Sequence, residues 1–196
     1  MASDLDQIGD GPRHAKTPGR NRWIVEWVLV LLAALGLAFV LRTWVIQTYS
    51  IPSVSMVPTL MVGDRILVDK LSYHLHPVHR GDVVVFATPP KEVPILNVKD
   101  LVKRVIGLPG ETISSGPNGE VFINGKLIDQ PWLTESARHK PGPPIVKQKI
   151  PPGQMFVMGD NRGSSDDSRY FGTVPESLIV GRAVLGFWPL SRIHWL

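Results

Sequence analysis

Apolar and polar positions divide the chain into two parts with different patterns. Residues 23–45, WIVEWVLVLLAALGLAFVLRTWV, are almost continuously apolar, whereas the following sequence consists of short β-branched runs separated by glycine, proline and polar residues. A continuous apolar run of this length predicts a helix that crosses a membrane. The short runs predict strands. The pattern therefore predicts a β domain tethered by one N-terminal transmembrane helix.

The uncharged centre of the apolar run, residues 27–41, spans only 15 residues and is bracketed by Glu26 and Arg42. A membrane span needs about 20 residues. Both charged side chains can extend to the membrane surfaces, and tryptophans near both ends resemble an interfacial aromatic belt. The run is then long enough. Because no small-x-small cleavage site follows it, we expect a permanent signal anchor rather than a cleaved secretory signal or a buried core helix.

The residues before the anchor predict its orientation. Residues 1–22 are polar and rich in glycine and proline, which is typical of a disordered tail. Four basic residues lie just before the apolar run: Arg13, Lys16, Arg20 and Arg22. Since positive charge favours the cytoplasmic side, the tail is expected in the cytoplasm and residues 46–196 outside it.

The sequence beyond Ile46 has no helical period and predicts a mainly antiparallel β domain. Strands are expected at 65–73, 82–87, 100–107, 154–160 and 178–188. Residues 120–129 read as a hairpin, since Asn124-Gly125 suits a two-residue turn. The proline-rich stretch 134–153 is expected to be an exposed loop.

Composition narrows the possible chemistry. The 196 residues suit one domain plus an appendage, and 43% hydrophobic residues suffice for a core. The net charge is +4, but no stripe of basic and aromatic residues predicts a nucleic-acid partner. The chain has no cysteine, which excludes disulfides, a thiolate nucleophile and cysteine-ligated metals.

Histidine and lysine are the candidate bases. His74, His76 and His79 could together bind zinc, but no HExxH or carboxylate ligand pattern accompanies them, so a solvated loop is favoured and no metal is expected. Lys103 alternates with apolar residues in the strand expected at 100–107. Burial there would lower its pKa and make it a competent general base. Lys70 satisfies the same pattern, so alternation alone does not separate the two lysines.

Two polar segments stand out. In IPSVSMVPTLMVGD, residues 51–64, prolines flank Ser53 and Ser55 and restrict the backbone that holds both hydroxyls. The second segment, GDNRGSSDDSRYFGTVP at 159–175, mixes carboxylates, arginines and serines. It is typical of a loop braced by ion pairs and hydrogen bonds, although composition alone favours a solvated turn.

Three motifs occur in order after the apolar run: SxSMxPT at 53–59, KRVxGLPGE at 103–111 and GDNRxxSxDSRYFG at 159–172, with RGDVVVF at 80–86 between the first two. Together they resemble bacterial type I signal peptidases, the membrane-anchored serine proteases that remove signal peptides from exported preproteins. The resemblance covers about residues 25–196.

The resemblance implies roles for individual residues. Ser55 matches the nucleophile, and Lys103 matches the general base and later general acid of a Ser-Lys dyad. Ser53 matches a hydroxyl that shares the oxyanion hole with the Ser55 N–H, and Ser165 matches the residue that orients the lysine. It implies two supporting pairs, Asp167 with Arg169 and Asp160 with Arg104. It also implies that two residues line shallow apolar pockets for small substrate side chains, namely Ile51 and Val102.

The resemblance also implies location and partners. It predicts an enzyme of the bacterial plasma membrane, or of a thylakoid or mitochondrial inner membrane. Its partners would be preprotein signal peptides, membrane lipid and the nearby secretion translocon, with no cofactor. Some relatives have a large second β subdomain between the last two motifs. Here only the 48 residues 111–158 are available, which predicts a small cap.

Two alternatives remain at this stage. A self-cleaving repressor-type protease also uses serine and lysine, but it would carry a DNA-binding helical domain in place of the anchor. A non-enzymatic anchored β domain, such as a receptor or assembly scaffold, would require the three motifs to be coincidental.

Overall fold

The computed structural model describes residues 20–40, 45–90, 92 and 98–196, which fall into two units divided after Val40. The first unit contains helix α1 (Arg20–Val40). The segment Arg22–Phe39 of this helix has a mean hydropathy of 1.9. Among the described residues, α1 is the one helix long and apolar enough to cross a membrane.

Helix α1 begins three residues before the expected start of the span. Arg20–Arg22 therefore belong to the helix, which corrects the predicted end of the disordered tail. Arg22 supports this first turn because its Nε donates to Glu26 Oε1 at 3.3 Å, one helical turn away. The rest of the expected tail, with Arg13 and Lys16, lies outside the described residues.

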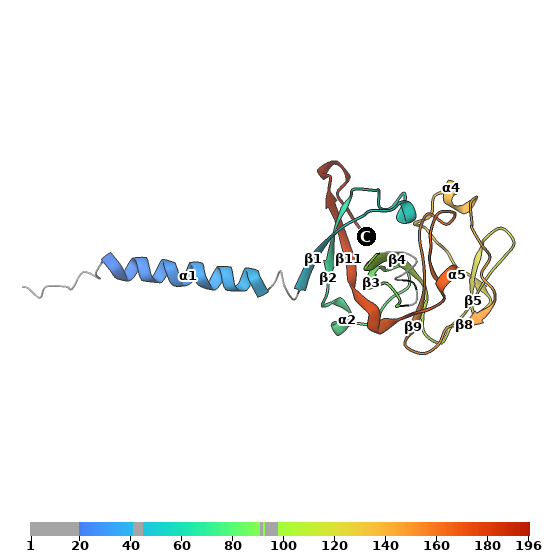
Figure 1. Cartoon of the computed structure of the whole chain (residues 1–196), viewed down its shortest axis with the longest axis horizontal. Helices are drawn as coiled ribbons and strands as arrows, with labels where there is room; N and C mark the ends of the chain where they lie inside the picture. The colour runs from blue at the N-terminus through green and yellow to red at the C-terminus, as the bar shows by residue number, and fades with distance from the viewer. Residues whose placement is uncertain (1–19, 41–44, 91, 93–97) are drawn as a thin grey trace, which may run out of the picture. The chain divides into compact units, whose positions relative to one another are not determined.

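The second unit is mainly antiparallel β, as expected from the sequence (Figure 1). Its larger sheet has eight strands in the order β1-β2-β11-β3-β4-β9-β10, with β12 paired to β11. The strands are β1 (Ile46–Ser50), β2 (Arg65–Asp69), β3 (Val83–Ala87), β4 (Asp100–Gly107), β9 (Gln154–Met158), β10 (Val174–Pro175), β11 (Ile179–Trp188) and β12 (His194–Trp195). The expected strands at 82–87, 100–107, 154–160 and 178–188 are thus present to within two residues.

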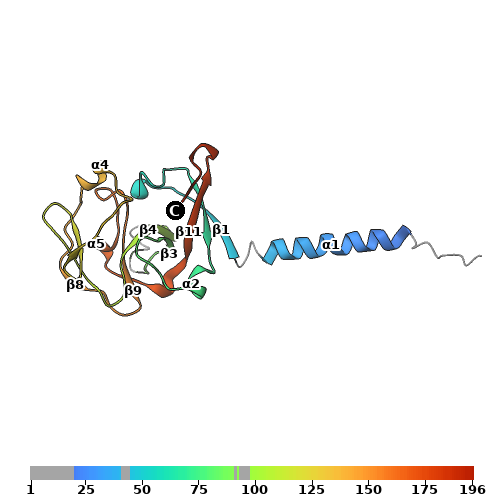
Figure 2. The ribbon, with the colours of Figure 1, turned by 180° about the vertical axis from the view of Figure 1, so that it is seen from behind.

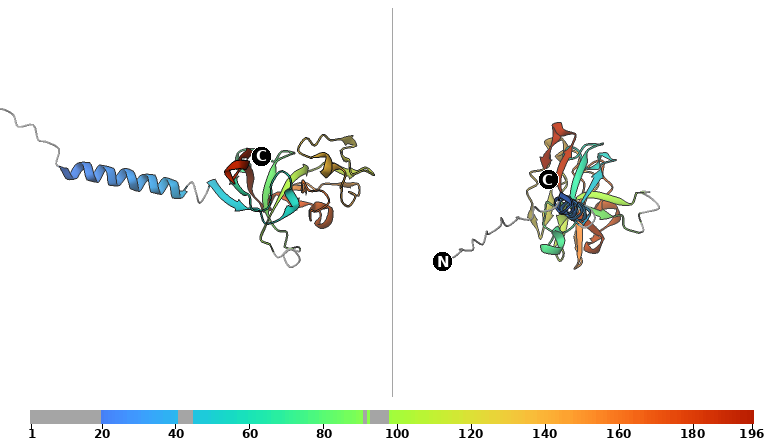
Figure 3. Two further views of the ribbon diagram at one scale, coloured as in Figure 1. Left: turned by 90° about the horizontal axis from the view of Figure 1, so that it is seen from above. Right: turned by 90° about the vertical axis from the view of Figure 1, so that its left-hand side faces the viewer.

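A smaller sheet has the order β7-β6-β5-β8, with β5 (Thr112–Ser115), β6 (Val121–Ile123), β7 (Lys126–Leu127) and β8 (Gln148–Lys149). We call residues 112–149 the cap. Asn124 and Gly125 form the expected hairpin turn, with φ of 52° and 77°. In Figures 1 and 2, β8 lies across the domain from β1, and Figure 3 shows the same separation from above.

The cap is shorter than the predicted 111–158, because β9 pairs with β4 and β10 in the larger sheet. Phe156 and Met158 of β9 pack against Ile113, Val121 and other apolar residues of the cap. One face of the larger sheet thus supplies the surface that buries the small one, since a four-stranded sheet of this size needs a second layer.

Short helices appear where only strands or loops were expected. The expected strand at 65–73 ends at Asp69, whose carboxylate accepts bonds from Leu71 N and Ser72 N and Oγ and so starts helix α2 (Ser72–Leu75). The other short helices are η2 (Val54–Met56), α4 (Glu135–Arg138), α5 (Ser168–Phe171), η3 (Glu176–Leu178) and η4 (Leu190–Arg192).

The sequence predicts an exposed loop at 134–153, and this prediction is only partly right. The stretch contains α4 and β8, and Ile145 and Ile150 are buried between the two sheets at 5% and 0% exposure. Its prolines suggested a solvated segment, but these two isoleucines fill the core under the cap.

Candidate active site

Ser55 is held in a short helical turn whose apolar neighbours are fixed in the core. Ser55 lies in η2. The side chains of Met56 and Leu60, which follow it, are only 1% and 0% exposed. The loop is closed at its base by hydrogen bonds of 2.9 Å from Ile51 N to Asp64 O and from Gly63 N to Ile51 O. The Ser55 side chain is therefore presented by a segment that the core immobilises.

Lys103 reaches Ser55 from the middle of β4. Its Nζ donates to Ser55 Oγ at 2.7 Å, and its side chain is buried at 3% exposure. Desolvation lowers the pKa of Lys103 to about 8, although the carboxylates of Asp167, Asp166 and Asp160 act in the opposite direction. An amine that loses its proton near neutral pH, in contact with a hydroxyl, can act as a general base.

Two other serines lie near this pair. Ser53 Oγ is 3.2 Å from Ser55 Oγ, on the more exposed side of the loop. Ser165 is buried, and its Oγ has no hydrogen-bond partner among the described residues. The structure thus places Ser53 next to Ser55 but records no bond between Ser165 and Lys103.

Asp160 and Arg104 form a buried, bidentate ion pair. Arg104 Nε and Nη2 donate to the Asp160 carboxylate at 2.9 and 2.7 Å, and Arg104 Nη1 donates to Gly81 O at 2.7 Å. Thr59 Oγ1 adds a third donor to Asp160 at 2.6 Å. Because Arg104 follows Lys103 on β4, this pair ties the strand of the lysine to the loop at Asp160.

Asp167 and Arg169 form a second buried pair. Arg169 Nε and Nη2 donate to Asp167 at 2.8 and 2.7 Å, and both side chains are 0% exposed. Asp167 also accepts from Gly159 N at 3.0 Å and from Arg169 N at 3.2 Å, so it caps α5. The loop from Gly159 to Arg169 is therefore braced by ion pairs, and it is not the solvated turn that composition favours.

A cleft of about 510 Å³ opens beside Ser55. Residues 49–56 and 98–103 line most of it, together with Ser164 and Asp166. Ile51 and Val102 are both in this lining and pack in the same apolar cluster. The cleft combines an apolar wall with the hydroxyl and amine at its end.

The other sequence candidates lie elsewhere. Lys70 follows β2 and is not among the residues that line the cleft. The His76 and His79 rings lie 5.6 Å apart, and no group of three metal-ligating side chains occurs among the described residues.

Sequence reasoning missed several contacts of the site. Asn161 donates through N to Ser55 O at 3.0 Å and through Nδ2 to Val54 O at 3.1 Å. Asn161 lies within the GDNR motif at 159–162, so the motif could have indicated that it belongs to the site. Two cap residues, Gln130 and Trp132, contact arginines of the same region, and nothing in their local sequence indicates this.

A buried hydroxyl next to an amine of low pKa, in an antiparallel β domain, is an arrangement suited to hydrolysis by a serine enzyme. The model of the family described as "Signal peptidase, peptidase S26" matches residues 24–188. The chain belongs to this family, whose members are serine endopeptidases that cleave signal peptides from preproteins.

Two relatives in sequence agree with the family assignment. The chain is 40% identical over 184 residues to a signal peptidase I of Leptolyngbya laminosa, covering 91% of this chain and 87% of the relative. It is 33% identical over 186 residues to signal peptidase IB of Staphylococcus aureus, covering 88% and 93%. A crystal structure of a signal peptidase I from Enterococcus faecalis, 29% identical, matches 56% of this chain and 98% of its own with a TM-score of 0.46.

Proposed function

We propose that Ser55 is the nucleophile and Lys103 the general base of a membrane-bound signal peptidase. The observation that carries the proposal is the 2.7 Å contact between Lys103 Nζ and Ser55 Oγ in a buried environment. Burial favours the neutral amine, and only a neutral amine can accept the serine proton. Family membership supplies the reaction, the hydrolysis of a peptide bond after a signal peptide.

The reaction follows from these positions. Neutral Lys103 takes the proton of the Ser55 hydroxyl as its oxygen attacks the scissile carbonyl. The negative oxygen that forms is stabilised by the Ser55 N–H and the Ser53 hydroxyl. Lys103 then donates the proton to the departing amine, which leaves an acyl ester on Ser55. Water, deprotonated by Lys103, hydrolyses that ester and restores the serine.

Supporting residues hold this geometry. We assign Ser165 to the orientation of Lys103, because its buried hydroxyl lacks another partner among the described residues. The pairs Asp160–Arg104 and Asp167–Arg169 fix the loop behind Ser55 and strand β4. Each pair is buried, so its geometry is held by packing as well as by charge.

The apolar wall of the cleft sets the substrate preference. Ile51 and Val102 leave room for small side chains at the first and third positions before the cut. An apolar pocket discriminates by about 1–3 kcal/mol per methylene, so the preference is graded and larger residues are cleaved progressively more slowly.

Membrane placement follows from the chain order. We assign residues 1–22 to the cytoplasm, residues 23–45 to the span and residues 46–196 to the far side of a bacterial plasma membrane. Ser55 lies ten residues beyond the end of the assigned span at residue 45, and an extended chain of that length reaches at most about 35 Å. The site then works near the membrane face, next to lipid and to preproteins that leave the translocon.

Cleavage of a preprotein by full-length variants tests the proposal. Ser55→Ala is expected to lower turnover by about 10⁴-fold or more, because the nucleophile is lost. Ser53→Ala is expected to lose about 10²- to 10³-fold, the usual effect of one oxyanion donor. Ser136→Ala in the exposed part of the cap serves as control and should match the unmodified enzyme. A folded Ser55→Ala enzyme with turnover within tenfold of the unmodified chain would contradict the proposal.

A further inference from the structure

Two residues of the cap reach the loop behind Ser55. Gln130 and Trp132 lie between β7 and α4, two positions apart, and each contacts one buried arginine. Those arginines, Arg162 and Arg104, are 3% and 6% exposed. The cap is therefore in direct contact with the groups that support the proposed nucleophile.

Gln130 satisfies an arginine that has no carboxylate partner. Arg162 Nη2 donates to Gln130 Oε1 and Arg162 Nε donates to Gly159 O at 3.1 Å, while no salt bridge involves Arg162 among the described residues. Burial lowers the pKa of Arg162 to about 10. A buried guanidinium that loses an acceptor is costly, so the Gln130 amide is needed where it lies.

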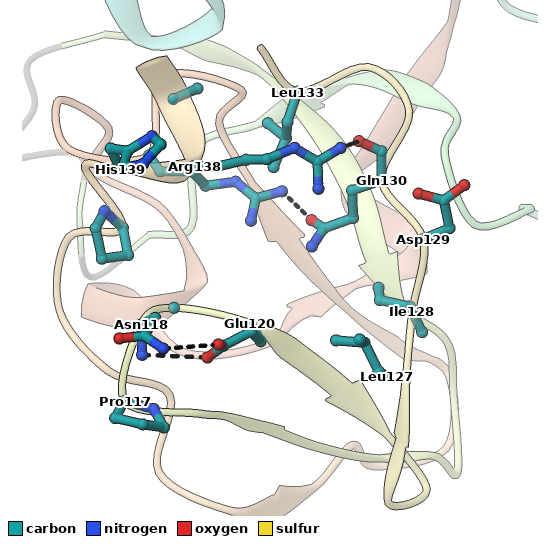
Figure 4. Close-up of a pocket in the computed structure, with 14 residues that line it drawn as sticks. Pro117, Asn118, Glu120, Leu127, Ile128, Asp129, Gln130, Leu133, Arg138 and His139 are labelled. Carbon is teal, nitrogen blue, oxygen red and sulfur yellow. Dashed lines mark hydrogen bonds between the residues drawn. The ribbon is translucent and has the colours of Figure 1, made fainter. Parts of the chain in front are cut away.

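Gln130 is buried, and its main chain is also held. It is 4% exposed, and its backbone oxygen accepts a bond of 2.8 Å from Arg138 Nη2, as Figure 4 shows. Arg138 belongs to the short helix α4, and both Arg138 and Leu133 line the cavity drawn in Figure 4. Gln130 is thus held between the cap helix on one side and Arg162 on the other.

Trp132 covers the second arginine. The Arg104 guanidinium carbon lies 4.8 Å from the Trp132 ring centroid, which is cation–π geometry. The edges of the guanidinium are occupied by Asp160 and by Gly81 O. Trp132 also packs close to Gly81, where an added Cβ would lie 3.5 Å from the ring. The Trp132 ring therefore covers a flat face of the Arg104 guanidinium, on which no hydrogen bond is made.

Both contacts end on the same short loop. Arg162 bonds Gly159 O and Arg104 bonds Asp160, and the residue that follows, Asn161, donates from N to Ser55 O at 3.0 Å. The loop of residues 159–162 is thus bonded to the cap on one side and to the main chain of Ser55 on the other.

We propose that Gln130 and Trp132 are positioning residues for the reaction at Ser55, acting through Arg162 and Arg104 on the 159–162 loop. The proposal rests on the function assigned above to Ser55 and Lys103. It gives the cap a part in turnover in addition to its part in folding. Displacement of a reacting group by about 1 Å can cost up to about 100-fold in rate, so modest loosening of this loop is measurable.

The two residues should affect turnover more than substrate binding. Neither Gln130 nor Trp132 is among the residues that line the cleft at Ser55. Gln130 instead lines a separate cavity of about 880 Å³ within the cap, whose walls carry Leu127, Ile128 and Glu120 (Figure 4). A substitution at either residue therefore leaves the lining of the cleft intact.

The test compares full-length variants in detergent micelles. Gln130→Met removes the acceptor, and Trp132→Leu removes the aromatic face. Competent sites are counted with a serine-acylating reagent, and kcat per competent site and KM are measured with a preprotein. Each variant is expected to lower kcat about tenfold, within the range set by small displacements, and to leave KM within about twofold.

Matched variants separate positioning from packing. Trp132→Phe keeps a ring face and Gln130→Glu keeps an acceptor, so both should restore kcat to within about threefold of the unmodified enzyme. Leu127→Ala, at an exposed residue that lines the same cap cavity, should change nothing. If Gln130→Met does not fold, the Trp132 series alone decides the outcome.

Three results would overturn the proposal: unchanged kcat per competent site in Trp132→Leu, an equal loss in Leu127→Ala, or no recovery in Trp132→Phe. A lower count of competent sites with normal kcat would mean that the cap contributes to folding only. If the function proposed for Ser55 is itself wrong, the result is different, because Ser55→Ala would then retain turnover.

Discussion

The surroundings of Lys103 set the pKa of its amine. A lysine in water has a pKa near 10.5, and at neutral pH it is a cation that cannot accept a proton. In β4 it is almost completely buried, and desolvation lowers its pKa to about 8. At pH 7 the neutral form is a minority of about a tenth, and it becomes the majority above pH 8.

This pKa predicts a pH profile. If Lys103 is the base, as proposed above, its neutral form is the active one, and kcat/KM should rise tenfold per pH unit on the acid side and level off near pH 8. The sign is fixed, since protonation removes the base and activity falls as the pH drops. Turnover measured from pH 5.5 to 10 tests this expectation, and an acid limb centred near pH 6.5 would point to a histidine instead.

Replacement by arginine tests the same assignment. An arginine stays protonated throughout this range, so Lys103→Arg should abolish turnover. Lys70→Arg is the matched control, because Lys70 lies outside the cleft, and it should keep turnover within about twofold. Thermal melts of both variants control for folding. Near-normal turnover in a folded Lys103→Arg enzyme would show that Lys103 is not the base.

At the scale of elements, the segment from β9 to α5 is built around Asp167. Its carboxylate caps α5, pairs with Arg169 and accepts from Gly159 N, which connects three parts of one loop. Arg169 Nη1 also donates to Pro141 O in the cap at 2.6 Å. The loop is therefore fixed by an ion pair and by hydrogen bonds to its own main chain and to the cap.

Neutralising Asp167 should destabilise this segment. Asp167→Asn leaves the Arg169 guanidinium buried without its counter-charge, and breaking a buried pair in this way costs about 3–5 kcal/mol. The free energy of unfolding, measured by denaturant titration, gives the effect. The neighbouring Asp166→Asn is the control, because Asp166 is exposed, and it should change stability by less than about 0.5 kcal/mol. Equal effects of the two substitutions would argue against a special role for the buried pair.

At the scale of the whole molecule, the chain joins an apolar helix to a β domain with a separate core. Helix α1 has an 18-residue apolar segment whose side chains are exposed throughout, which is suited to contact with lipid. Basic residues lie before the helix at 13 and 16 and in its first turn at 20 and 22. Together these features predict one crossing with the N-terminus in the cytoplasm.

Single cysteines test this orientation, since the native chain has none. A membrane-impermeant maleimide added to spheroplasts should label Ser136→Cys, which lies at an exposed position of the cap. Ser3→Cys should react only after the membrane is permeabilised. Both variants should cleave a preprotein normally. The reverse labelling pattern would place the β domain in the cytoplasm and exclude the proposed topology.

The sequence by itself determined the features that depend on near neighbours. The apolar run gave α1, the alternating runs gave β3, β4, β9 and β11, and Asn124-Gly125 gave a hairpin turn. Periodicity is a property of consecutive residues, so these elements could be predicted without a fold. The motifs and their resemblance to a family indicated Ser55 and Lys103 before any geometry was known.

Only the tertiary structure decided which residues meet. Lys103 and Lys70 have the same local pattern, yet Lys103 contacts Ser55 across 48 positions of sequence. Thr59 meets Asp160 across 101 positions. Burial and contact depend on how strands pair and sheets stack, and alternation does not encode the partner. For the same reason, the burial of Ile145 and Ile150 could not be predicted from their proline-rich stretch. The contacts of Gln130 and Trp132 with buried arginines likewise depend on how the cap packs, which their local sequence does not indicate.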